Sequence, residues 1–243
     1  MKKSKTRIFI NKAISSNLLI YLKGKQLHFL KNVMRVKIND EIDVFDGLTG
    51  EWKALIMSIN RDTIVLKVKN LNIKYKKNND VWLIFSPIKQ HRMSIAIQKA
   101  TELDVSRIIP CITEFTNLRK INIKSLYENA IEAAEQSQRL DIPKIDNEIN
   151  INEMLEKWPK DRKIIFCDEK IEDNQSVIEK LSPIKNFLNK SAVFIGPEGG
   201  FSNKERDILR NNKEVISVSL GDKVLRSDTA ITVALFSIQQ LLS

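Results

Sequence analysis

The feature that most constrains the fold is a regular alternation of short apolar segments and longer amphipathic segments after residue 80. The short segments are residues 81–85, 107–111, 163–166, 192–195 and 215–220. Apolar runs of this length are typical of strands covered on both faces of a parallel sheet. Between them, apolar residues recur at helical spacing within 93–100, 126–137 and 231–242. Strands that alternate with helices predict an α/β domain with a mainly parallel sheet.

The first 70 residues have a different rhythm. Residues 41–45 alternate and run into Asp46-Gly47, which is a strong turn signal. Two more strand-like segments follow at 52–59 and 63–68, and only 27–34 looks helical. This pattern predicts a small β-rich barrel or sandwich.

A polar stretch at 70–80 separates the two patterns. It is rich in lysine and asparagine and has no periodicity, which is typical of a linker. We therefore expect a β-rich domain at 1–72 and an α/β domain at 73–243.

Composition limits the classes of protein. Lys and Arg number 40 against 30 Asp and Glu, a formal charge of +10, which favours a polyanionic partner or, equally, a lysine-rich solvated surface. No apolar run approaches the roughly 20 residues that span a bilayer, and the N-terminus lacks a signal-peptide core. We expect a cytoplasmic protein with no membrane partner.

Two isolated cysteines, Cys111 and Cys167, and two distant histidines, His28 and His91, predict neither a disulfide framework nor a metal site.

Four of only seven glycines follow the last two predicted strands: Gly196, Gly199, Gly200 and Gly221. Open α/β sheets bind ligands beyond the carboxyl ends of their strands, so these glycines predict ligand-binding loops. The alternative is a plain strand-to-helix turn. The chain has neither a G-x-x-x-x-G-K-[ST] phosphate loop nor a G-x-G-x-x-G motif, and the second absence removes the main signature of a Rossmann-type cofactor site.

Both glycine loops lead into predicted helices. Ser202 and Glu205 fit a capping box, and Ser227 or Asp228 is the expected N-cap of the last helix. Arg226 stands just before that helix, where free backbone N–H groups favour anions. The alternative is a capped helix with a surface arginine.

Four sequence clusters, at 99–105, 134–143, 195–201 and 220–230, occur in an order that resembles the RsmE family of the SPOUT class of methyltransferases. Residues 28–35 and 44–47 extend the resemblance over nearly the whole chain. Members of that family methylate N3 of a uridine in 16S ribosomal RNA of the small subunit, near the decoding centre. Two departures from the family pattern are Asp104, where glycine is usual, and Ser227-Asp228, where Thr-Glu is usual.

The resemblance implies an N-terminal PUA-like β-barrel that helps bind RNA and a C-terminal domain knotted as a trefoil. It also implies a homodimer, the small ribosomal subunit as partner, and S-adenosylmethionine as methyl donor without a metal. Loops after Phe166, at 196–200 and at 220–226 would form the cofactor site. The cofactor-binding residues expected from it are Ile195, Gly196, Gly199, Gly200, Leu220, Gly221, Val224, Leu225 and Arg226.

The expected chemistry centres on Arg226, which would stabilise negative charge on the uracil, with Glu198 or Asp228 as proton acceptor. The RNA-binding residues expected are Arg7, His28, Arg35, Lys37, Arg92 and Arg139, each with a solvated surface charge as its alternative. Two rival functions stay open. One is a SPOUT methyltransferase that acts on another RNA, such as transfer RNA, and the other is a non-catalytic RNA-binding module.

Overall fold

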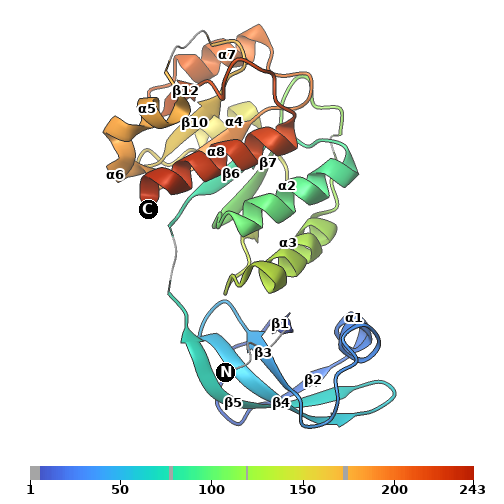
Figure 1. Ribbon diagram of the computed structural model, residues 1–243. Helices are drawn as coiled ribbons and strands as arrows, with labels where there is room; N and C mark the ends of the chain where they lie inside the picture. Colours follow the sequence, from blue (N-terminus) through green and yellow to red (C-terminus); the bar gives the residue numbers. More distant parts are fainter. Residues whose placement is uncertain (1–5, 77–78, 119, 172–174) are drawn as a thin grey trace. The chain divides into compact units, whose positions relative to one another are not determined.

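The computed structural model describes residues 6–76, 79–118, 120–171 and 175–243. The chain divides into two compact units (Figure 1). The first unit comprises residues 1–77 with 134–142, and the second comprises 78–133 with 143–243. The sequence placed the boundary at residue 72 and did not foresee that 134–142 belongs with the N-terminal strands.

The first unit is a five-stranded β domain whose strand order is β1-β3-β4-β5-β2. The strands are β1 (Arg7–Phe9), β2 (Leu19–Leu22), β3 (Glu41–Phe45), β4 (Gly50–Ile59) and β5 (Ile64–Lys74). β1 pairs with β3 in parallel, and the other pairs are antiparallel. The predicted strands and the turn at Asp46-Gly47 are confirmed. The buried Asp46 carboxylate holds this turn by accepting hydrogen bonds from the backbone N–H groups of Leu48 (2.9 Å) and Thr49 (2.8 Å).

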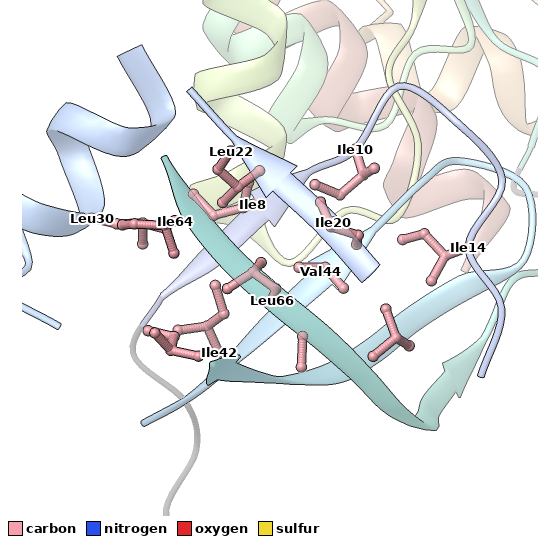
Figure 2. Close-up of a cluster of buried hydrophobic side chains, with 13 residues drawn as sticks. Ile8, Ile10, Ile14, Ile20, Leu22, Leu30, Ile42, Val44, Ile64 and Leu66 are labelled. Carbon is pink, nitrogen blue, oxygen red and sulfur yellow. The ribbon is translucent and has the colours of Figure 1, made fainter. Parts of the chain in front are cut away.

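One apolar core fills this unit (Figure 2). Ile8 of the edge strand β1 and Ile20 of the opposite edge strand β2 belong to the same cluster, together with Val44 and Leu66 from the middle of the sheet. A sheet whose two edges share one core has the character of a barrel. The predicted helix at 27–34 is confirmed as α1 (Gly24–His28) followed by a π-helical turn η1 (Phe29–Val33).

The expected linker at 70–80 is strand over its first half, which corrects the prediction. β5 continues to Lys74 because β4 pairs with it as far as Gly50↔Lys74 and Trp52↔Leu71. Cross-strand pairing outweighs the polar composition of this segment. Lys77 and Asn78, which the prediction also covered, lie outside the described residues.

The second unit is built on a parallel sheet with the order β12-β10-β11-β6-β7-β8, and β9 also pairs with β7. Its strands are β6 (Trp82–Phe85), β7 (Arg107–Ile112), β8 (Lys144–Ile145), β9 (Ile149–Asn150), β10 (Lys163–Cys167), β11 (Ser191–Ile195) and β12 (Val215–Val218). All five predicted strands are confirmed, and every pair recorded in this sheet is parallel. Both cysteines are buried and unpaired, as expected.

The helices of this unit are α2 (Gln90–Glu102), α3 (Ile123–Ser137), α4 (Ile151–Glu156), α5 (Val177–Leu181), η2 (Ser182–Ile184), α6 (Lys185–Leu188), α7 (Asn203–Arg210) and α8 (Ser227–Leu242). The last four residues of α3 count with the first unit. Although β12 lies at the sheet edge, the following helix α8 returns to pack on β11 and beside α2 (Figure 1). Within the described ranges, no helix has the length and apolarity needed to cross a membrane.

Candidate functional site

A cavity of about 390 Å³ lies at the carboxyl ends of β10, β11 and β12. Three loops surround it, one after each strand, and they contribute residues 167–169, 195–200 and 219–227 to its wall. Small-molecule sites have volumes of roughly 300–1,000 Å³ and favour this edge of open α/β sheets. The cavity is therefore the first candidate for a ligand site.

The residues expected to bind the cofactor come together in this cavity. All nine line it: Ile195, Gly196, Gly199, Gly200, Leu220, Gly221, Val224, Leu225 and Arg226. The sequence predicted that the loop after Phe166 takes part in the site, but it singled out no residue there. This loop contributes Cys167, Asp168 and Glu169 to the cavity wall. Their one local signal is a position directly after a buried strand.

The glycine loop after β11 owes its shape to Phe201. A Cβ atom at Gly196 would lie 2.5 Å from the Cε2 atom of the Phe201 ring, so only glycine fits there. Phe201 is buried, and its ring stacks edge-on against Phe166 and Phe194 with centroids 4.9 and 5.0 Å apart. The loop therefore lies against a well-packed aromatic cluster rather than moving as a free hairpin.

The predicted capping box at the start of α7 is confirmed. The backbone N–H of Ser202 donates to Glu205 Oε2 (2.9 Å), and Ser202 Oγ accepts from the Glu205 N–H (3.3 Å). Glu205 Oε1 also accepts from the backbone N–H of Glu114 (2.8 Å), which follows β7. These bonds fix the end of the glycine loop.

The predicted N-cap of α8 is wrong. Arg226 occupies the N-cap, without a side-chain capping bond, and Ser227 and Asp228 are the first two residues of the helix. The Ser227 hydroxyl instead donates to the carbonyl of Gly196 (3.0 Å) and so joins two of the cavity loops. A side chain recruited by a distant loop is no longer available to cap its own helix.

The charged side chains at and near the cavity differ in whether they have a hydrogen-bond partner. Arg92, at the start of α2, donates to Glu198 Oε1 (2.6 Å), and both side chains line the cavity. Arg226 is exposed, and its guanidinium has no ion pair or hydrogen bond within the described ranges. Asp228 does not line the cavity, but its Oδ1 is buried and finds no partner among the described residues.

Two of the residues expected to bind RNA have largely buried side chains in the first unit. Arg7 forms an ion pair with Glu51 (2.7 Å) and donates to the carbonyls of Ala134 and Arg139 (both 2.8 Å). Arg139 pairs with Asp141 (2.6 Å), and its side chain is only 4% exposed. Both guanidinium groups bind residues of segment 134–142, which belongs to the first unit. We therefore do not include Arg7 and Arg139 among the proposed RNA-binding residues.

Three others are exposed on the first unit: His28, Arg35 and Lys37. Arg35 has φ +52°, and the Val36 N–H bonds to the Leu30 carbonyl (3.1 Å) around it, as at a helix end where glycine is usual. A large charged residue that occupies such a position at an energetic cost is a candidate for function. Arg92 lies on the second unit at the cavity.

No group of three metal-ligating side chains occurs among the residues that the structure describes. Asp104 has φ +65°, the backbone conformation that favours glycine. Aspartate tolerates this region better than most residues, so the departure from the resembled pattern leaves the backbone conformation in place.

The comparisons with known proteins define the class. Residues 75–239 match the model of the RNA methyltransferase domain family, and residues 22–69 match that of the RNA methyltransferase PUA domain. Together with the parallel sheet, these matches define an RNA methyltransferase with an N-terminal PUA domain and a C-terminal α/β methyltransferase domain.

Relatives over the full length define the family. The Ribosomal RNA small subunit methyltransferase E of Rickettsia conorii is 34% identical over 97% of this chain and 95% of its own. The enzyme of that name from Buchnera aphidicola subsp. Schizaphis graminum is 29% identical over 98% of this chain and 97% of its own. The chain belongs to the ribosomal RNA small subunit methyltransferase E family.

A solved structure supports the same relationship. The crystal structure of the Neisseria gonorrhoeae methyltransferase E, bound to S-adenosyl methionine, matches with a TM-score of 0.85 at 25% identity. The match covers 97% of both chains.

Proposed function

We propose that this protein transfers a methyl group from S-adenosylmethionine to N3 of a uridine in 16S ribosomal RNA of the small subunit, near the decoding centre. The observation that carries the proposal is the cavity formed by three strand-end loops, in a chain that matches a methyltransferase E relative over 97% of its length.

The cavity residues fit S-adenosylmethionine chemically. Ile195, Leu220 and Leu225 offer apolar surface for an adenine ring. Val224 lines the cavity yet is 84% exposed, an apolar side chain that no described residue covers. When bound, the cofactor supplies an electrophilic methyl group on a sulfonium.

The protein's own task is to make uracil N3 a nucleophile. N3 carries a proton, and its removal leaves negative charge spread over the ring and the carbonyl oxygens. Arg226, exposed at the cavity and without an ion-pair partner in the described ranges, is the residue we assign to that charge. Replacing Arg226 by alanine should leave cofactor binding intact and remove most of the turnover.

The two candidate proton acceptors differ in their surroundings. Glu198 is engaged by Arg92, and this ion pair suits a role in orienting that guanidinium toward RNA phosphate. Asp228 does not line the cavity itself, but it adjoins Ser227, which does, and it keeps one buried oxygen without a partner among the described residues. We therefore assign proton acceptance, through a water molecule, to Asp228. The assignment predicts that Asp228→Asn lowers kcat about 100-fold, whereas Glu198→Gln acts mainly on the KM for RNA.

For RNA contacts we propose His28, Arg35 and Lys37 on the β domain and Arg92 at the cavity. If several of these contact phosphates, binding will weaken steeply with salt. We further propose a homodimer in which the two subunits share the RNA site. The substrate implies a cytoplasmic enzyme.

Two experiments separate this function from its rivals. Calorimetric titration with S-adenosylmethionine should show saturable binding, whereas a non-catalytic RNA-binding module would show none. Labelled methyl groups should then enter 16S RNA of small subunits from a strain that lacks this gene. Incorporation into transfer RNA instead would favour the rival SPOUT enzyme.

A further inference from the structure

A buried ionic cluster lies behind the cofactor cavity and has no part in the chemistry assigned above. Asp168, which follows β10, is 1% exposed, and Arg206 of α7 is 3% exposed. The Arg206 guanidinium donates to Asp168 Oδ1 with one nitrogen and to Glu169 Oε1 with the other. Arg210, one turn later on α7, donates from Nε to Asp168 Oδ2 (2.8 Å).

The ionic contacts of this cluster join the first loop of the cavity to the helix that follows the second, and the backbone of Asp168 also bonds to the strand that precedes the third. Asp168 and Glu169 form the first loop, and Arg206 is on the helix that the glycine loop enters. A Cβ atom at Gly200 would collide with the Glu169 carboxylate and lie 3.2 Å from Arg206 Nη2, so glycine permits this close approach. The backbone N–H of Asp168 donates to the carbonyl of Val218 (3.0 Å), directly before the third loop.

Stability alone is a weak reason for such an arrangement. A buried ion pair loses about as much free energy on desolvation as it gains from attraction, and well-packed apolar residues often replace it without loss. Arg206 Nε, moreover, is buried with no hydrogen-bond partner in the described ranges. What the cluster does supply is a fixed distance between loops, because the two nitrogens of one planar guanidinium hold two adjacent carboxylates.

We propose that Asp168 and Arg206 are positioning residues that hold the cofactor cavity in its binding shape before the ligand arrives. The inference rests on the proposed function, since it takes S-adenosylmethionine as the ligand. Loss of the ion pair between Asp168 and Arg206 should weaken cofactor binding, because the loops would then have to be ordered at the moment of binding. The methyl-transfer step itself should change little.

The chain contains a matched control at the opposite end of β10. Arg162, directly before that strand, is 2% exposed and, like Arg206, is paired with a carboxylate, that of Asp80. It donates to the carbonyl of Ser191 (3.0 Å) and lies 3.6 Å from the centre of the Trp82 ring. Arg162→Met and Arg206→Met thus remove the same chemical group from equally buried sites, and only the second site borders the cavity.

The test measures the Kd for S-adenosylmethionine by calorimetry, KM and kcat for methyl transfer, and thermal unfolding. Arg206→Met should raise the Kd and the KM for S-adenosylmethionine about tenfold or more with kcat nearly unchanged. Arg162→Met should lower stability and leave both constants at their wild-type values. Asp168→Asn, nearly identical in shape to aspartate, is measured in parallel and should act like Arg206→Met, so the test survives if one variant fails to fold.

The outcomes are distinct. Cofactor binding by Arg206→Met and Asp168→Asn at wild-type affinity would overturn this inference and leave the proposed function standing. Equal weakening by Arg162→Met would also overturn it, since the effect would then follow from stability. Failure of the wild-type protein to bind S-adenosylmethionine would overturn the proposed function and this inference together.

Discussion

Replacing Gly196 by alanine tests whether Phe201 sets the shape of the glycine loop. The added Cβ would lie 2.5, 2.9 and 3.1 Å from the Cε2, Cδ2 and Cζ atoms of the Phe201 ring, where carbon atoms normally approach to about 3.5–4.0 Å. The ring therefore has to move by roughly 1 Å, but Phe166 and Phe194 pack against it on the protein side. Forced overpacking of this kind lowers the free energy of unfolding by about 1–3 kcal/mol.

Thermal unfolding followed by circular dichroism would measure the change. For a chain of this size, a loss of 2 kcal/mol lowers the Tm by about 4–8 °C. Because the strain arises between two side chains, Phe201→Leu should relieve it. The double variant Gly196→Ala/Phe201→Leu should be more stable than the sum of the two single changes predicts, by about 1–2 kcal/mol.

Gly221→Ala is the control for this cycle. Gly221 has φ +113°, but an added Cβ atom would meet no other atom within 4 Å, so alanine there strains the backbone without touching Phe201. The loss in free energy of unfolding caused by Gly221→Ala should simply add to the loss caused by Phe201→Leu. Strict additivity in the Gly196 cycle, or wild-type stability of Gly196→Ala, would refute the reasoning.

Three further predictions follow from single residues of the backbone turns. Arg35→Gly should raise the free energy of unfolding by about 0.5–1 kcal/mol, because φ is +52° there. It should also reduce by about 1 the slope of log K for RNA binding against log salt concentration, and an unchanged slope would contradict a phosphate contact. Asp104→Val should be about 1–2 kcal/mol less stable than Asp104→Gly in urea unfolding, because φ at this position is +65° and only glycine adopts that conformation freely. Burial tends to raise the pKa of Asp46, but hydrogen bonds from Thr49 and from backbone N–H groups hold that pKa below its usual value. Since a depressed carboxylate pKa stabilises the fold above the unfolded-state pKa of about 4, the stability difference between wild type and Asp46→Asn should be full at pH 7 and shrink as the pH falls below about 4.

Much of the second unit could be predicted from sequence because its signals are local. Each strand is a short apolar run, and the ligand loops follow strands at glycines that a Cβ atom would block or strain, as at Gly196 and Gly200. The capping box at Ser202 and Glu205 is likewise contained in four consecutive residues. Elements of this kind form from the interactions of residues close in the chain.

The features that the sequence did not reveal depend on distant partners. β5 extends through a polar segment because β4 pairs with it. The Arg7 side chain is largely shielded from solvent because carbonyls of Ala134 and Arg139, more than 100 residues away, accept its hydrogen bonds. The ion pair between Asp168 and Arg206 joins two residues that belong to no local sequence motif, so it is recognised only in the folded structure.

The most direct test of the proposed function is the identity of the methylated nucleoside. Small subunits from a strain that lacks this gene are incubated with S-adenosylmethionine and either wild-type protein or Arg226→Ala, and the 16S RNA is then digested and analysed by mass spectrometry. Wild type should yield 3-methyluridine at a single position, and Arg226→Ala should yield almost none although it still binds the cofactor. A methyl group on a ribose or on another base, or full 3-methyluridine formation by Arg226→Ala, would contradict the account.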